Sequence, residues 1–365
     1  MSESRPSGAL LSSRIGGLAA RTALPLVVPP FAALVYPLIL EAFHACVTSL
    51  MSGHAAAPAL RTALAVLLLI LALAMPMLAL LSAFSLGEIQ EPSLAQRRAR
   101  AVALLAVAAP PMFVFLGVEL YILKDPVPEL WLWAAFWLAA AGLVVFSDSK
   151  TTIASLPGAK PARAGLRVVH GLSALGILVI FLALHLANHL TFVAGPEVYR
   201  AVMKTVRRVY RQEVLQPLLI ALFLFQVGSG VYLATRASAQ PMDRFRSFQI
   251  GSGVFLAAYV LGHMNSVFVF GRLYLGIDTD WSFATGAPAG LIKDAWNIRL
   301  VPHYGLGVFF VLSHLAAGAR AVMLTHGVRK AYADRFLIGS ATAAAGLAFV
   351  ILFGMSGGRL SFALP

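Results

Sequence analysis

Histidine is the residue type whose spacing in this chain points to chemistry, because several of its nine His residues lie inside long apolar segments. His263 lies within GVFLAAYVLGHMNSVFVFGR (253–272), and His185 lies within 168–193. Each is about 17 residues from the start of its predicted helix, so a rise of 1.5 Å per residue brings both imidazoles to one level. An imidazole at membrane depth is a functional candidate by default. Two at one level can bind a haem iron from opposite faces, and we predict that this pair holds a b-type haem.

Three further residues belong to the same hypothesis. His314 lies about 12 residues into a helix of the opposite direction, which places it roughly 10 Å nearer the cytoplasm, at the level of a second haem. Its counterpart in an internal repeat is Gln226, a poor iron ligand. Either a second haem has another axial group, or His314 contacts a propionate, a quinone or only its packing neighbours. His189 is four residues beyond His185 on the same helix face, and we expect it to contact that ligand rather than the iron.

The repeat is a two-helix unit that occurs twice in the second half of the chain. Segments 170–193 and 215–233 form the first unit, and segments 249–270 and 300–324 form the second. The aligned pairs are His170 with Gln249, Ser173 with Ser252, His185 with His263, and Gln226 with His314. Four helices in two related pairs are a scaffold that can hold a cofactor between facing helices.

The remaining histidines give weaker signals. His44 and His54 lie at and beyond the outer end of the first apolar segment, where a solvated His needs no special role. His303 and His326 lie near helix ends, where we expect contact with water. His326 and His170, both on the cytoplasmic side, are also candidates for quinone protonation.

Composition identifies the class of protein that carries these residues. Of the 365 residues, 59% are hydrophobic and 12% are charged, with a mean hydropathy of +0.83, well outside the range of soluble domains. Spanning a bilayer takes roughly 20 apolar residues as helix. We therefore predict an all-α polytopic membrane protein with nine transmembrane helices. The predicted spans are 24–45, 62–85, 101–123, 128–147, 168–193, 215–235, 247–271, 302–324 and 336–356.

The net charge of +13 fits membrane insertion better than nucleic-acid binding, because most Lys and Arg residues fall in short loops between the spans. Nine spans place these loops on one side, with the N-terminus in the cytoplasm and the C-terminus outside. Segment 197–215 is the exception, since it is basic on the predicted outer side, and its helical apolar spacing predicts an amphipathic helix at the headgroups. The loop residues are Arg5, Arg14, Arg97, Arg98, Arg100, Lys150, Lys160, Arg163, Arg167, Arg236, Arg244, Arg246, Arg329, Lys330 and Arg335.

Three regions are predicted along the chain. Residues 1–150 form a four-helix membrane region of unknown role, 151–166 a cytoplasmic linker, and 167–358 a five-helix haem-binding domain. The single Cys46 excludes an intrachain disulfide, a Cys-ligated iron–sulfur cluster and a structural zinc site. The start of the chain lacks the pattern of a cleaved signal peptide, so the first helix is expected to remain as an anchor.

A family resemblance follows from short motifs in 165–356. HLAAGARAVMLTHG contains His314-x3-Gly318-x-Arg320-x6-Gly327, the spacing of a haem-binding helix, and HGLSA (170–174) and QIGSG (249–253) resemble the H/Q-R-x-S/T-G helix start without its Arg. These motifs resemble the membrane cytochrome b anchor subunit of succinate dehydrogenases and fumarate reductases, although Gln226 stands where the two-haem form has His.

The resemblance implies haem b on His185 and His263, with His314 as half of a nearer pair. It implies quinone as substrate and iron–sulfur and flavoprotein dehydrogenase subunits as cytoplasmic partners at a bacterial inner membrane. The candidate quinone contacts are His170, Ser173, Ser252 and Arg246.

The leading interpretation is thus an electron-transfer subunit rather than a stand-alone enzyme, since no nucleotide fingerprint, Cys cluster or flavin motif occurs in the chain. Two alternatives stay open. One is a haem-containing membrane sensor or anchor for a cytoplasmic signalling protein. The other is a secondary transporter, although most acidic residues fall in loops and leave no evident carboxylate relay.

Overall fold

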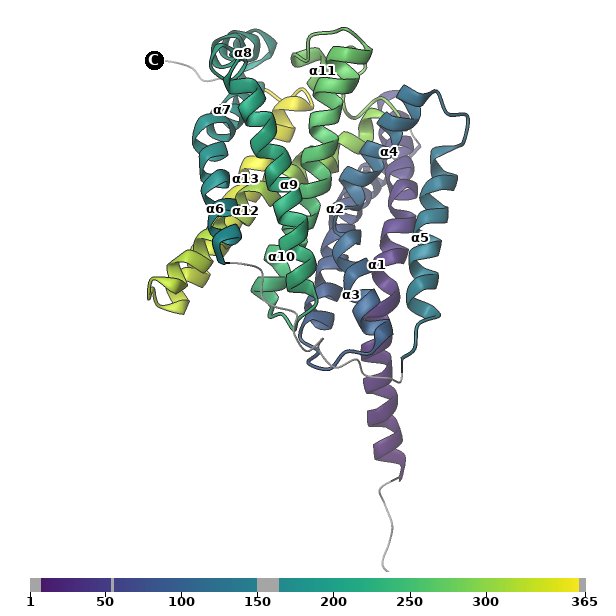
Figure 1. Ribbon diagram of the computed structural model, residues 1–365. Helices are drawn as coiled ribbons and strands as arrows, with labels where there is room; N and C mark the ends of the chain where they lie inside the picture. Colours follow the sequence, from purple (N-terminus) through teal and green to yellow (C-terminus); the bar gives the residue numbers. More distant parts are fainter. Residues whose placement is uncertain (1–7, 54–55, 150–163, 361–365) are drawn as a thin grey trace, which may run out of the picture.

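The computed structural model describes residues 8–53, 56–149 and 164–360, and in these ranges every regular element is a helix (Figure 1). The all-α prediction is therefore confirmed for the described chain. The first half contains α1 (Gly8–Met51), α2 (Pro58–Gly87), α3 (Leu94–Ala106), α4 (Ala109–Leu123) and α5 (Glu129–Val145). The second half contains α6 (Ala164–Ile177), η1 (Leu178–Leu182), α7 (Ala183–Leu190), η2 (Thr191–Ala194), α8 (Pro196–Tyr210), α9 (Leu215–Ser238), α10 (Arg244–Met264), η3 (Asn265–Tyr274), α11 (Trp281–Thr285), η4 (Asn297–Arg299), α12 (Leu300–Thr325) and α13 (Lys330–Met355).

Seven helical segments of the described chain are long and apolar enough to cross a membrane, or eight if the bent pair α3–α4 counts as one span. The expected helix 101–123 is divided between these two helices, which meet at 66°. Pro110 and Pro111 open α4, and proline lacks the backbone N–H that would continue α3. The expected span 128–147 corresponds to α5, an apolar helix of 17 residues. The expected count of nine spans is therefore not reached by helix length and composition.

Other predicted elements lie close to their expected places. The amphipathic helix expected in 197–215 is α8, which begins at Pro196 because a proline at the first helical position loses no hydrogen bond. Helix α6 begins at Ala164, inside the predicted linker 151–166, and most of that linker lies outside the described residues. His54 also lies outside them.

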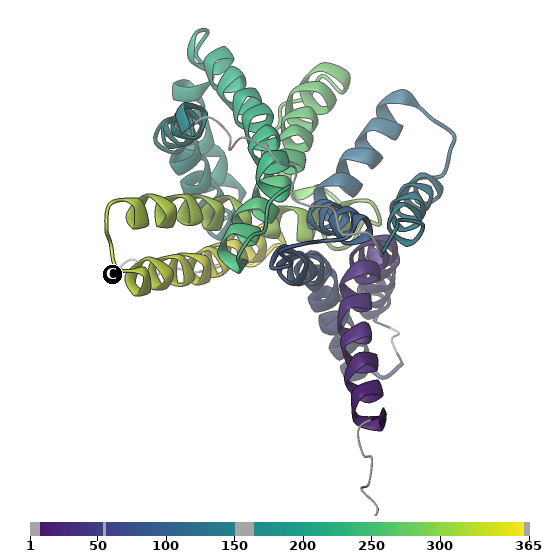
Figure 2. The same cartoon turned by 60° about the horizontal axis from the view of Figure 1, so that its bottom comes forward.

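The two halves of the chain lie side by side and share one apolar core (Figures 1 and 2). Helices α10 and α12 of the second half pack against α2 and α4 of the first. Tyr36 and Trp137 belong to the same buried cluster as Phe255 and Phe310. The predicted boundary between residues 150 and 167 therefore divides the sequence but not the core.

Arg100 corrects an expectation about the basic loops. It lies in α3 and is 2% exposed. Its guanidinium donates to the carbonyls of Leu86, Ile89, Ser238 and Gln240 at 2.6 to 3.3 Å. Because carbonyls at a helix end lack intrahelical donors, Arg100 supplies donors to the end of α2 and to the turn between α9 and α10. It joins the two halves instead of marking a loop.

Candidate functional site

The candidate site is a cavity of about 230 Å³ in the second half of the chain, enclosed by α7, α9, α10, α12 and α13. Residues of α8 and α11, two helices at one end of the bundle (Figure 1), also line it. Its walls are mostly apolar, but four His, four Tyr and three Arg line it. These residues are His185, His189, His263, His303, Tyr199, Tyr210, Tyr259, Tyr304, Arg207, Arg211 and Arg272.

The cavity brings together the two histidines that the repeat aligns. The rings of His185 on α7 and His263 on α10 have centroids 6.1 Å apart and planes inclined at 70°. Two imidazoles that each place a nitrogen about 2 Å from one metal ion have centroids roughly 6 Å apart. Their separation therefore fits two axial ligands of one ion.

The ring of His185 already has a partner in this arrangement. Its Nε2 lies 3.0 Å from Nε2 of His189, and Phe181 stacks on it with centroids 4.8 Å apart. Binding a metal ion through that nitrogen would require the ring of His185 to turn away from His189. Because His189 contacts His185 directly, it is placed to orient this ring.

Tyr259 connects His263 to a histidine that the sequence did not single out. Its ring stacks on His263 at 5.6 Å and lies 4.6 Å from the ring of His303. His303 is only 2% exposed, so the expectation that it contacts water is wrong. The cause is the start of α12 at Leu300, preceded by η4, which puts His303 inside the packed helix. A Cβ at Gly307 would collide with Tyr259, so the glycine permits this packing.

His185 and His263 each lie beside a π-helical turn. Segment η1 ends three residues before His185, and η3 begins two residues after His263. A π-turn shifts the side chains that follow it relative to a regular α-helix, and such turns are frequent at functional sites. This local feature had no signal in the hydropathy pattern.

The end of the cavity nearest α8 is basic. The guanidiniums of Arg207, Arg211 and Arg272 line it, and the buried Nε atoms of Arg211 and Arg272 have no hydrogen-bond partner among the described residues. Burial raises the pKa of Tyr199 on α8, against an opposing effect of Arg207, so its hydroxyl stays protonated at neutral pH. This end is suited to an acidic group.

His314 and Gln226 lie outside the cavity and make equivalent contacts in the two repeat units. Gln226 Nε2 donates to the Ser173 hydroxyl and to the carbonyl of His170. His314 Nδ1 lies 2.9 Å from the Ser252 hydroxyl. Ser173 donates to the carbonyl of His170, and Ser252 donates likewise to the carbonyl three residues before it. Each unit thus ties its second helix to its first through the same serine position.

The four candidate quinone contacts are divided between two helices. His170 and Ser173 are on α6, where His170 Nδ1 lies 2.7 Å from the hydroxyl of Ser229. Ser252 and Arg246 are on α10, where Arg246 donates to Gln249 Oε1 at 2.9 Å. In the described chain no hydrogen bond joins one pair to the other.

The other predicted features have structural partners. His44 contacts the carbonyl of Lys293 at 2.8 Å, and the exposed His326 contacts the carbonyl of Val322. Arg320, part of the sequence motif, forms an ion pair with Asp334 at 2.7 Å. No group of three or more His, Cys, Asp or Glu in the described ranges is arranged to hold a metal ion. Two imidazoles, those of His185 and His263, can bind only a metal ion whose other ligands are not supplied by the protein.

Comparisons with known proteins add no relative. A scan against protein-family models, a search of curated proteins and a search of solved structures each found no match to this chain.

Proposed function

We propose that this chain is a membrane electron-transfer subunit that binds one b-type haem between His185 and His263 and exchanges electrons between a partner protein and quinone. The observation that carries the proposal is the separation of 6.1 Å between two imidazoles from equivalent repeat helices inside an apolar cavity. The second half of the chain, 167–358, is in this proposal a five-helix cytochrome b-like bundle.

The residues present fit haem in kind. Bis-His ligation is typical of electron-transferring haem b, and the macrocycle itself supplies the remaining iron ligands. The apolar walls suit the porphyrin faces, and Arg272, which has no ion pair with another described residue, would neutralise an acidic group. The cavity volume of about 230 Å³ is below the range of about 300–1,000 Å³ for ligand sites. Side chains at the cavity must therefore turn on binding, and His185 is the first of them.

Haem, when bound, supplies a one-electron iron couple; the protein controls its surroundings. His189 holds the His185 ring through the contact between their Nε2 atoms, and this contact would be given up if iron bound that nitrogen. Tyr259 stacks on His263 and limits rotation of that ring. The apolar walls exclude water, which affects the reduction potential through the local dielectric.

One haem is proposed rather than two, because Gln226 stands in the other repeat unit at the place of His314. Both side chains contact the equivalent serine, His314 through Nδ1 to Ser252 and Gln226 to Ser173. Because Gln, a poor iron ligand, makes the same contact in the other unit, His314 is better suited to a structural role than to iron ligation.

Quinone, the dehydrogenase partners and the cellular setting stay predictions. The hydroxyls of Ser173 and Ser252 both have protein partners, which gives the quinone assignment the least support. A cytoplasmic N-terminus and a bacterial inner membrane follow only from the loop charges and the resemblance.

The test is a dithionite-reduced minus oxidised spectrum of the detergent-purified protein, with a pyridine haemochrome count. We expect a sharp α band of low-spin haem b and one haem per chain, reoxidised when a soluble quinone is added. Protein from haem-replete cells that contains no haem would refute the proposal. Haem without quinone reactivity would favour the sensor alternative.

A further inference from the structure

Helix α8 carries two different stripes along its length. Arg200, Lys204, Arg207, Arg208 and Arg211 recur at helical spacing and form the basic stripe. Val198, Val202, Val206 and Val209 recur on another side and form the valine stripe, of which Val198 is 44% and Val209 43% exposed. Between the stripes, Tyr199 and Met203 are buried against the rest of the protein. The helix is thus attached to the bundle along one side and keeps both stripes on its other sides.

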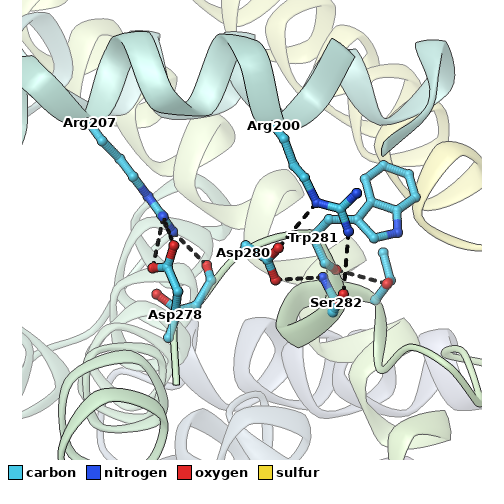
Figure 3. A network of polar contacts seen from close by, with 8 residues as sticks. Arg200, Arg207, Asp278, Asp280, Trp281 and Ser282 are labelled. Carbon is cyan, nitrogen blue, oxygen red and sulfur yellow. Dashed lines mark hydrogen bonds and ion pairs between the residues drawn. The ribbon is translucent and has the colours of Figure 1, made fainter. Parts of the chain in front are cut away.

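The basic stripe forms one wall of an open groove of about 500 Å³, and the chain between η3 and α11 forms the other. Five basic side chains and two carboxylates line this groove, which leaves an excess of three positive charges. Figure 3 shows how the two walls are joined. Arg207 donates to both carboxylate oxygens of Asp278 at 2.8 and 2.9 Å, and Arg200 donates to Asp280 at 3.2 Å.

Lys204 and Arg208 are the charges of the groove that remain available. Both are exposed, and neither has a hydrogen bond or ion pair with another described residue. Arg200 and Arg207 have carboxylate partners and fix the shape of the groove. The ion pairs join the two walls of the groove, and the charges of Lys204 and Arg208 give it a net positive charge.

We propose that this groove binds the phosphate of an anionic membrane lipid. An interfacial helix places its apolar side at the boundary between headgroups and acyl chains and its basic side among the headgroups. Helix α8 lies at the ends of the long helices (Figure 1). In this proposal the valine stripe faces the acyl boundary and the basic stripe faces the lipid phosphate. The proposal is independent of haem, because Lys204 and Arg208 line the groove but not the His cavity.

The experiment uses the full chain purified in a neutral detergent and titrated with short-chain phosphatidylglycerol or phosphatidylcholine, with bound lipid counted by native mass spectrometry. We expect phosphatidylglycerol to bind more tightly, and K204Q/R208Q to remove the preference. Each basic residue near an anionic surface is worth about fivefold in affinity, so the double variant is expected to lose roughly thirtyfold. The matched control is R329Q/K330Q, which removes the same charge from two exposed residues at the start of α13.

Three results would overturn the proposal. The first is equal binding of the two lipids by the wild type. The second is equal loss of phosphatidylglycerol in both double variants, which would show a general charge effect. The third is displacement of the lipid by inorganic phosphate, but not by chloride at equal ionic strength, which would assign the groove to free phosphate. Helix content and elution volume of each variant show that it is folded.

Discussion

The two repeat units place their aligned histidines, His185 and His263, in the same cavity, yet the surroundings of the units differ. The difference is largest between the second helices of the two units: 11% of the most apolar stretch of Leu215–Ser238 is buried, against 44% of that of Asn297–Thr325. The first half of the chain covers α10 and α12 and leaves α6 uncovered, so Leu172 and Val179 are more than half exposed. The two units therefore have the same internal contacts but different neighbours. Residues 1–150 therefore cover the second unit, because α2 and α4 pack against α10 and α12.

The largest effect is expected from breaking the histidine pair itself. His185→Ala and His263→Ala should each abolish haem binding, because low-spin haem needs both axial imidazoles and each unit supplies one. Haem content per chain is the measurement. The control His326→Ala, at an exposed residue, should keep the full content. A variant of either unit that retained low-spin haem would show that the units do not contribute equally.

The contact between the two halves of the chain can be tested by replacing Arg100. Arg100→Met removes the donors to four carbonyls at the junction of the halves, and hydrogen bonds to a charged group are worth about 1.5–3 kcal/mol each. We expect a loss of about 3 kcal/mol, seen as a lower unfolding midpoint in detergent. Arg97→Met on the same helix is the control. Equal midpoints would mean that Arg100 does not hold the halves together.

The equivalence of Gln226 and His314 predicts a smaller effect on stability, which differs between two substitutions of His314. His314→Gln should be tolerated, since the other unit uses Gln at that place, whereas His314→Leu should cost about 1 kcal/mol for the lost contact with Ser252. Unfolding midpoints compare the two variants. Haem content should stay at one per chain in both. A fall in haem content with His314→Gln would establish His314 as an iron ligand.

The smallest effect concerns the contact between α8 and Asp278. Partial burial raises the pKa of Asp278, but the charges and hydrogen bonds of Arg207 and Arg211 outweigh it and hold that pKa below its usual value. The contact should therefore persist at neutral pH and be lost as the pH falls through the lowered pKa. Because the carboxylate is largely exposed, the effect on stability is small.

Hydrogen exchange of α8, corrected for the intrinsic rate at each pH, measures this loss. Asp278→Asn should show already at neutral pH the faster exchange that the wild type shows in acid. If the variant and the wild type exchange equally at neutral pH, the ion pair does not hold α8 in place.

Several features could be predicted because they depend on local pattern. Apolar length identifies the long helices, and the repeat aligns His185 with His263 at one level. Pro110 and Pro111 lie inside the expected span 101–123 and could have predicted the break between α3 and α4. The high hydropathy of the segment instead favoured one continuous helix.

Other features had no local signal. His303 joins the cavity only because α10 and α12 cross where Gly307 admits Tyr259. The basic residues of 197–215 indicated an interfacial helix, but the ion pair of Arg207 with Asp278, which builds the groove, joins residues more than 70 positions apart. Such contacts depend on how helices rotate and cross, which hydropathy does not encode.

The sequence by itself determined that this protein is a bundle of membrane-length helices, because in hydrocarbon a backbone must satisfy its hydrogen bonds within each segment, and apolar length shows where that occurs. It also aligned His185 with His263 in the repeat. Only the tertiary structure decided which histidines share a cavity, that Arg100 is buried between the halves, and that α8 forms one wall of a basic groove. These outcomes depend on side-chain packing between helices, where a glycine or a π-turn changes which residues meet.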